Sequence, residues 1–519
     1  MRLKNLLPSL ILVAAAIAPW QSYAQSAPEN WFNLDKTQNG VMGVSAERAY
    51  AELLKDKQPK KKIIVAVIDS GVEADHEDLK DVMWVNKNEI PGNGIDDDKN
   101  GYIDDIHGWS FLGNGKGENI EFDTYELTRV YAKIKDKKKL TAKEQAIKNE
   151  FEEKSSKAKQ QLAFVSQIKN GLDDLKKVSG KTEPTNEDAL SLNYTGKEMI
   201  QMLLQNNEGI SITDLDAQVG PWYDHVAYSA NYGYNLDYNP RTIIGDNPKK
   251  LNEKGYGNND VEGPDAEHGT HVAGIIAANR NNDLGMKGVA NNVEIMSLRA
   301  VPNGDERDKD IANAIIYAVD NGATIINMSF GKGFSPDKKY VDKAVKYAEK
   351  KGVLLVHAAG NSSENIDVTE NFPTKAYGKY NAKKQASNWL EIGALNWRDG
   401  ENTPAPFSNY GKNNVDIFSP GVDLYSTIPN NGYKANSGTS MAAPAAAGVA
   451  ALVWSYYPEL SVKELILALT LSAKKLDITV VRPGEEKAGV NFQDLSVTGG
   501  VINAYDALKK AEEIVKNKK

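Results

Sequence analysis

The chain of 519 residues is 41% hydrophobic and has a formal net charge of −8, so it can bury a core and is not a disordered protein. The acidic balance gives no reason to expect nucleic acid or an anionic membrane as a partner. Cysteine is absent, which excludes disulfide bonds, thiolate metal sites and a cysteine nucleophile.

The first 24 residues have the pattern of a signal peptide. Two basic residues, Arg2 and Lys4, precede an apolar run from Leu6 to Ala18, and the small residues Ser22 and Ala24 suit a signal peptidase. The run is shorter than the roughly 20 apolar residues that span a bilayer, and no later segment qualifies. We therefore expect cleavage after Ala24 and export to the periplasm or the medium, with no membrane span.

Four continuous apolar runs rich in β-branched residues predict strands that are buried on both faces. They cover residues 61–68, 293–298, 324–328 and 353–358. Helical patterns at residues 310–320 and 337–351 alternate with them. This alternation predicts an α/β fold of three layers, with helices on both faces of a central parallel sheet and an active site at the carboxyl ends of its strands.

The stretch from Asp96 to Asp104 resembles a calcium loop, although His107 stands where an EF-hand has glutamate. Oxygen donors occupy positions 1, 3, 5 and 9, and a backbone carbonyl occupies position 7. These donors are Asp96, Asp98, Asn100, Asp104 and the carbonyl of Tyr102. A solvated acidic turn is the alternative. Because crowded carboxylates repel one another without a cation, we favour a structural calcium ion.

The segment from about residue 121 to 220 lacks strand patterns and predicts an inserted helical arm. Thr141 with Glu144, and Thr195 with Glu198, have the spacing of a capping box. Residues 142–178 read as one helix, in which apolar residues recur every seventh position, as in a coiled-coil seam. These positions are Phe151, Ala158, Val165 and Leu172.

Three short motifs carry the candidate chemistry. Asp69-Ser70-Gly71 ends the first predicted strand, His268-Gly269-Thr270-His271 follows the arm, and Gly438-Thr439-Ser440 opens an alanine-rich helix. Taken singly, they could be a turn, a pair of metal ligands and a tightly packed helix start. Together, the order aspartate, histidine, serine is one of the known chain orders of a catalytic triad.

In the motifs VAVIDSGV, HGTHVAGIIAA and SGTSMAAP the chain resembles the subtilisin-like serine peptidases, or subtilases. The likeness runs from about Gly43 to Ala511, with the arm excepted. Together with the signal peptide expected at residues 1–24, it implies one peptidase domain, residues 25–519, which the arm interrupts. It also implies an endopeptidase that acts on protein or peptide substrates.

The resemblance assigns roles to individual residues. Ser440 is expected to be the nucleophile, His268 the general base, Asp69 its orienting carboxylate and Asn361 an oxyanion donor. His271 is expected to be a packed helix residue. Around the nucleophile, glycine at 438 is expected to let the backbone bend, and the proline at 444 falls near the first helical turn, where a missing N–H costs little.

The resemblance also marks two binding features. Ser329, Phe330 and Gly331 match the segment that pairs with an extended substrate, although Phe330 could equally be a core residue. Asp78 falls where the family places a ligand of another calcium site. The loop at residues 279–284, which should complete that site, does not align cleanly, so the site stays open.

Two other functions are compatible with parts of the sequence. One is a tripeptidyl exopeptidase or peptide ligase that uses the same triad. The other is a catalytically silent scaffold that binds through the arm and the calcium loop, and the intact triad argues against it. The family pattern begins soon after Ala24 and ends near Lys519, so we expect no domain-sized propeptide and no further domain. Nothing in the sequence specifies an oligomeric state.

Overall fold

The computed structural model describes residues 27, 28, 30–207 and 209–518, so the expected signal peptide lies outside the described residues. The chain forms two compact units. We call residues 28–127 and 239–519 the sheet unit, and residues 128–238 the arm. The sequence pattern placed the insertion at about 121–220.

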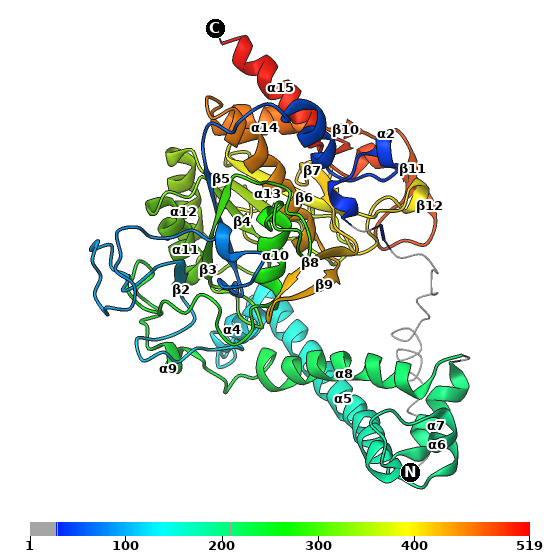
Figure 1. Ribbon diagram of the computed structural model, residues 1–519. Helices are drawn as coiled ribbons and strands as arrows, with labels where there is room; N and C mark the ends of the chain where they lie inside the picture. Colours follow the sequence, from blue (N-terminus) through cyan, green and yellow to red (C-terminus); the bar gives the residue numbers. More distant parts are fainter. Residues whose placement is uncertain (1–26, 29, 208, 519) are drawn as a thin grey trace. The chain divides into compact units, whose positions relative to one another are not determined.

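A nine-stranded sheet forms the centre of the sheet unit, in the order β10-β13-β7-β6-β5-β4-β1-β3-β2 (Figure 1). All neighbouring strands are parallel except β10 and β13. The predicted runs correspond to β1, β3, β4 and β5, so these predictions are confirmed. The strands are β1 (Ile63–Asp69), β2 (Gly108–Ser110), β3 (Val293–Arg299), β4 (Ile325–Met328), β5 (Leu354–Ala358), β6 (Trp389–Leu395), β7 (Ile417–Pro420), β10 (Lys474–Lys475) and β13 (Gly500–Val501).

Helices cover both faces of this sheet. Ala66 and Ile68 of β1 share a core with α11 (Asp308–Asp320) and α12 (Lys338–Lys351). On the other face α10 (Glu267–Ala277) and α13 (Thr439–Tyr456) pack against each other and against the central strands (Figure 1). Because successive strand residues point to opposite faces, a strand covered twice is apolar throughout. The three-layer α/β fold is confirmed.

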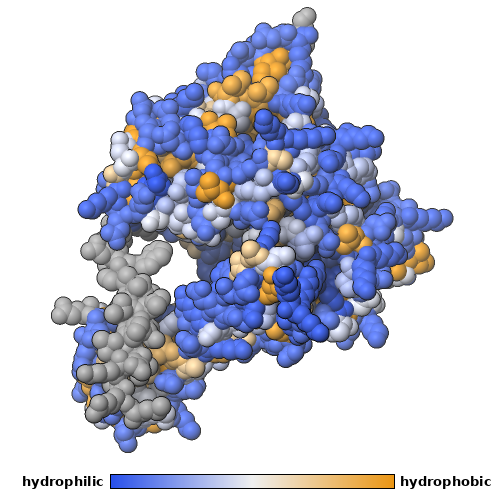
Figure 2. Space-filling model, turned by 180° about the vertical axis from the view of Figure 1, so that it is seen from behind, coloured by the Kyte–Doolittle hydropathy of each residue, from blue (hydrophilic) through white to orange (hydrophobic). Residues whose placement is uncertain are grey.

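Smaller elements complete the sheet unit. Two hairpins join β8 (Leu424–Ile428) to β9 (Gly432–Asn436) and β11 (Thr479–Val481) to β12 (Ala488–Asn491). The remaining helices are η2 (Trp31–Asn33), α2 (Lys36–Asn39), α3 (Ala46–Arg48), η3 (Ala49–Leu53), η4 (Lys80–Val82), α9 (Arg241–Ile244), η6 (Gly400–Asn402), α14 (Val462–Leu471), η7 (Phe492–Asp494) and α15 (Ala504–Lys516). Among the described residues, no helix is long and apolar enough to cross a bilayer. On the face shown in Figure 2, apolar patches are small and separated by hydrophilic residues.

The arm has a core of its own. The chain enters it along α4 (Glu126–Ala132), and α5 (Ala142–Ser179) is then a single helix of 38 residues. The predicted capping box at Thr141 is present, and all four seam positions are buried, so both predictions are confirmed. Val165 and Leu172 of the seam pack against α7 (Lys197–Asn206) and α8 (Ile212–Tyr228), and Phe151 stacks on Tyr131 of α4. Helix α6 (Asn186–Ser191) and the π-helical η5 (Ser229–Gly233) complete the arm.

The second predicted capping box is wrong. Helix α7 begins after Gly196, whose left-handed backbone has a φ of 74°, and no side chain caps its first turn. The N–H of Thr195 instead donates to Asp174 at 2.8 Å. Capping boxes occur at Thr185 and Ser211, where the third helical residue is aspartate in place of glutamate or glutamine.

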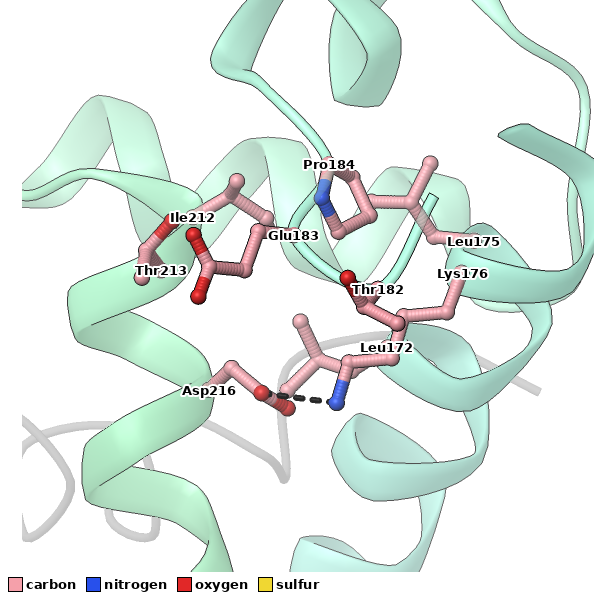
Figure 3. Close-up of a pocket in the computed structure, with 9 residues that line it drawn as sticks. All are labelled: Leu172, Leu175, Lys176, Thr182, Glu183, Pro184, Ile212, Thr213 and Asp216. Atoms are coloured by element: carbon pink, nitrogen blue, oxygen red, sulfur yellow. Dashed lines mark ion pairs between the residues drawn. The ribbon is translucent and has the colours of Figure 1, made fainter. Parts of the chain in front are cut away.

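A small pocket lies between α5 and α8 within the arm (Figure 3). Its empty volume is about 240 Å³, and an ion pair of 2.7 Å between Lys176 and Asp216 crosses its rim. Leu172, Leu175 and Ile212 contribute apolar surface. The pocket is thus a gap at the edge of the arm's own core.

The independent core of the arm leads to a testable expectation. Val165 on α5 is fully buried, so Val165→Asp places an unpaired charge in an apolar core and should unfold the arm. Hydrogen exchange should then show loss of amide protection in α5, α7 and α8, with protection retained in β1, β3 and β4. Gln160→Asp, at an exposed position of the same helix, is the control. Equal loss of protection in the central sheet would show that the two units do not fold separately.

Candidate active site

Three adjacent strands of the sheet bring the candidate residues to one edge. The register aligns Ile68 of β1 with Met328 of β4, and Met328 with His357 of β5. Asp69, Ser329 and the segment leading to Asn361 therefore leave the sheet side by side, although they are far apart in sequence. This edge lies at the carboxyl ends of the strands, where parallel sheets place their sites.

Asp69 and His268 form a short hydrogen bond. Nδ1 of His268 lies 2.6 Å from Oδ1 of Asp69, so it donates to the carboxylate, which also accepts the N–H of Ser70 at 2.8 Å. The side chain of Asp69 is 2% exposed, whereas that of His268 is 41% exposed. The pair therefore has a buried carboxylate at one end and an accessible imidazole at the other.

Two glycines allow this approach. A Cβ on Gly269 would lie 2.0 Å from the carbonyl oxygen of Gly71, so no other residue lets the start of α10 lie so near the end of β1. Gly71 has a φ of 132°, and a Cβ there would lie 2.1 Å from the carbonyl oxygen of Glu262. Steric clashes with backbone oxygens thus explain why glycine stands at positions 71 and 269 in the sequence motifs.

The Asp69 carboxylate also sets the protonation of the imidazole. Burial by itself lowers the pKa of His268, but the charge and hydrogen bond of Asp69, helped by Asp265 and Glu267, raise it above the ordinary value of 6.5. His271 shows the opposite behaviour, because burial lowers its pKa to about 4. Its Nε2 donates to the carbonyl oxygen of Lys434 at 3.0 Å, so the neutral ring ties α10 to β9.

Ser440, the second residue of α13, is tied to the end of β4 by two hydrogen bonds. Its hydroxyl donates to the carbonyl oxygen of Ser329 at 3.1 Å, and the Ser329 hydroxyl donates to the carbonyl oxygen of Ser440 at 2.9 Å. In a regular helix that carbonyl would accept the N–H of residue 444, but Pro444 has none. The expectation that Pro444 lies near the first turn is therefore corrected: it lies in the second turn and frees the carbonyl of Ser440.

Asn361 contacts the same helix start. Its side-chain oxygen accepts the N–H and the hydroxyl of Thr439 at 2.8 and 2.9 Å, which leaves its Nδ2 to donate elsewhere. Gly438 is extended, with a φ of 160°, so conformational freedom does not explain it, contrary to the sequence expectation. A Cβ on Gly438 would lie 3.4 Å from Nδ2 of Asn361 and 3.6 Å from the backbone nitrogen of Ser440. Glycine keeps the space beside these two donors open.

The segment after β4 presents an unpaired backbone edge. In the part of the chain that the structure describes, no backbone hydrogen bond reaches Phe330 or Gly331. Lys332, the next residue, exchanges two backbone bonds of 2.9 Å with Phe372. The ring of Phe330 packs against the core, with its centroid 6.3 Å from that of His357. The backbone of Phe330, and not its side chain, is the group open to a ligand.

The acidic loop gathers carboxylates, one of which the sequence pattern missed. Oxygens of Glu89, Asp96 and Asp98 all lie within 4.8 Å of one another. The carboxylate of Asp104 lies outside this group. Its oxygens accept the N–H groups of Asn93 and Gly94 at 3.2 and 2.8 Å. Glu89 stands outside the nine-residue pattern, and only the turn of the chain brings it to the loop.

The structure also shows the surroundings of Asn100 and of Asp78, where the sequence left a second calcium site open. The side-chain oxygen of Asn100 accepts the N–H of Tyr102 at 2.8 Å. Asp78 does meet the loop at residues 279–286: it accepts the side-chain amide of Asn282 at 2.7 Å and the N–H of Met286 at 3.3 Å. Burial raises the pKa of Asp78.

Comparison with known proteins gives a consistent result. Residues 60–493 match the model of the Subtilase family. A thermophilic serine proteinase of Bacillus sp. (strain AK1) is 43% identical over 206 residues, which are 39% of this chain and 47% of the relative. Subtilisin DY of Bacillus licheniformis is 38% identical over 213 residues, 40% of this chain and 71% of the relative. Thermitase of Thermoactinomyces vulgaris is 39% identical over 189 residues, which are 36% of this chain and 61% of the relative. The match thus spans about half the length of the first of these relatives.

The coupling of Asp69 to His268 can be measured directly. Asp69→Asn removes the charge that opposes burial, so the pKa of His268 should fall below its wild-type value. Because the wild-type pKa is raised on folding, protonated His268 stabilises the fold at pH values below about 6.5, and this contribution disappears as the pH rises through the folded-state pKa.

NMR titration of the imidazole provides the test. Asp265→Asn, which removes a weaker contribution, is the control and should lower the pKa less. An unchanged or higher pKa in Asp69→Asn would contradict the assigned interaction.

Proposed function

The chain belongs to the subtilase family, and from this premise we propose that it is a serine endopeptidase with Asp69, His268 and Ser440 as its catalytic triad. The observation that carries the proposal is the hydrogen bond of 2.6 Å between His268 and Asp69, at the same sheet edge to which Ser440 is tied. A buried carboxylate, an accessible imidazole and a serine at a helix start are the parts that this chemistry requires.

In the proposed reaction His268 acts first as a base. Its Nδ1 proton is held by Asp69, so the other ring nitrogen is the one free of hydrogen and able to take the proton of Ser440. The serine oxygen then attacks the scissile carbonyl, and the imidazolium delivers its proton to the leaving amine. Asp69 stabilises the imidazolium, in line with the raised pKa of His268. Water then attacks the acyl-enzyme carbonyl while His268 takes its proton, and His268 returns this proton to the oxygen of Ser440 as the bond to the acyl group breaks and the carboxylic acid leaves.

Two donors serve the oxyanion in this proposal. Nδ2 of Asn361 and the backbone N–H of Ser440 flank the space that Gly438 leaves empty. The N-terminal end of α13 adds the positive end of a helix dipole to the same place. These groups stabilise charge that appears only after attack, and such interactions lower the barrier.

An extended polypeptide is the proposed substrate. The free backbone groups of Phe330 and Gly331 can pair with a substrate strand in the manner of an added β-strand. Main-chain pairing is independent of side-chain identity, which suits a peptidase that cuts within protein chains. Export of the enzyme is proposed from the pattern of residues 1–24.

We also propose that the acidic loop holds a structural calcium ion. Glu89, Asp96 and Asp98 supply hard carboxylate oxygens, the donor type that calcium prefers. Asn100 and the carbonyl of Tyr102 follow in the same loop and complete the donor set. In this arrangement Asp104 holds the neighbouring turn at residues 93–94. The ion would neutralise the local charge and fix the loop, and it takes no part in peptide cleavage.

Replacement of the nucleophile tests the function. Ser440→Ala should lower the melting temperature only slightly, because it removes one of the two hydrogen bonds to Ser329. It should remove peptidase activity, by about six orders of magnitude if the loss equals that measured for subtilisin. Asn361→Ala should lower kcat by roughly a hundredfold or more with little change in KM. Mass mapping of the products separates internal cleavage from removal of tripeptides. Activity of Ser440→Ala within tenfold of the wild type would contradict the triad.

Chelation tests the calcium site. The Ser440→Ala protein, which cannot digest itself, should melt at a lower temperature in the presence of a chelator, because a bound ion contributes about 2.7 kcal/mol at a hundred times its Kd. Glu89→Gln should lower the melting temperature in calcium and abolish most of the chelator effect. Asp81→Asn, at an exposed carboxylate, is the control. A melting temperature insensitive to chelator in every variant would favour the acidic-turn interpretation.

A further inference from the structure

Lys332 has a buried ammonium group immediately after the open edge at Phe330 and Gly331. Its side chain is 2% exposed, and Nζ lies 2.8 Å from Oε2 of Glu126, 2.9 Å from Oδ1 of Asp308 and 2.7 Å from the carbonyl oxygen of Glu306. An ammonium group has three N–H donors, so these oxygens use all of them. The position of the Lys332 side chain is therefore fixed.

The open edge is held at both of its ends. At one end, Ser329 exchanges hydrogen bonds with Ser440. At the other end, the backbone of Lys332 is paired with Phe372, and its side chain is anchored by the three oxygens. The two residues between these ends can adjust only as far as the ends permit. Any shift of Lys332 moves the neighbouring Gly331, while Ser440 keeps its own contacts.

Glu126 reaches Lys332 from the root of the arm, which we define as residues 121–126. Glu126 is the first residue of α4, and its N–H donates to Asp305 at 2.7 Å. Asp123 pairs with Arg307 through bonds of 2.6 and 2.8 Å, and its N–H donates to the carbonyl oxygen of Asn303 at 3.0 Å. These bonds hold the root against the loop between β3 and α11. The carboxylate of Glu126, which is 5% exposed, contacts the ammonium group of Lys332.

We infer that Glu126 is a positioning residue. Through its ion pair with Lys332 it holds the backbone edge at Phe330 and Gly331 in the position from which it can pair with an extended peptide. Asp308 cannot replace it, because Asp308 also accepts the Ser335 hydroxyl and the N–H of Asp337. The inference rests on the proposed function, since the edge is the proposed substrate site. It makes the root of the insertion part of the peptide-binding apparatus.

Peptide affinity in an inactive background tests the inference separately from catalysis. In the Ser440→Ala protein, Glu126→Gln should weaken binding of oxidised insulin B chain about tenfold, because the edge moves when the buried ammonium keeps Asp308 but loses the other of its two anionic partners. In the active protein the same change should raise KM for a long peptide, with kcat and the hydrolysis of a small acetate ester unchanged within about twofold. Cleavage by the wild type tests the proposed function itself.

A matched control removes another buried ion pair. Asp342 pairs with Lys338 at 2.6 Å and accepts the N–H of Gly378 at 2.7 Å. Asp342→Asn should lower stability but leave peptide affinity unchanged. Glu126→Asp, which keeps the charge, should recover part of the affinity lost in Glu126→Gln.

A double-mutant cycle decides whether the pair acts as a unit. Lys332→Met should weaken peptide binding as much as Glu126→Gln, and the double variant should be no worse than either, because each single change already breaks the pair and the second change has no pair left to break. Additive losses would overturn the inference. So would unchanged peptide affinity in Glu126→Gln, or an equal loss in Asp342→Asn. Loss of ester hydrolysis in step with peptide binding would show that Glu126 serves the fold alone, and would also overturn it.

Discussion

The hydrogen bonds exchanged by Ser329 and Ser440 fix the geometry on which the proposed site depends. They join the end of a central strand to the start of a buried helix. The carbonyl of Ser440 is open to the Ser329 hydroxyl because Pro444 has no N–H to donate to it. Inside an ordinary helix such a proline is destabilising. In α13 it leaves the carbonyl of Ser440 free to accept the Ser329 hydroxyl at the end of β4. The serine is thereby placed by the sheet as well as by its helix, and the sheet also carries Asp69.

The features that follow from local pattern could be predicted from the sequence. Buried parallel strands need continuous apolar runs, and the glycines next to Asp69 and His268 mark close backbone approaches, so both leave a local signal. Glu89 leaves none, because it lies 9 residues before Asp98 and outside the spaced pattern, so only the turn of the chain brings it to the loop. The Glu126–Lys332 pair leaves none, because its two members are 206 residues apart and meet only in the folded chain. The helix start at Gly196 was missed because a left-handed glycine there replaces the side-chain cap that the pattern implied.

The insertion has a core of its own, and its root belongs to the sheet unit. Val165 and Leu172 of its seam lie in an apolar cluster formed by residues of the arm's own helices. Its root, in contrast, lies in the sheet unit and contributes Asp123 and Glu126 to buried or half-buried ion pairs. The proposed peptide-binding segment is thus contacted by residues that flank the insertion, while the helices beyond them form a separate core.

A crystal structure of the protein with a peptide boronate tests the central claim most directly. The account predicts a covalent bond from boron to Oγ of Ser440, with one boronate oxygen accepting from Nδ2 of Asn361 and from the N–H of Ser440. It also predicts that the peptide backbone pairs with Phe330 and Gly331. A boronate bound to another residue, or a peptide that leaves this edge unpaired, would contradict the account.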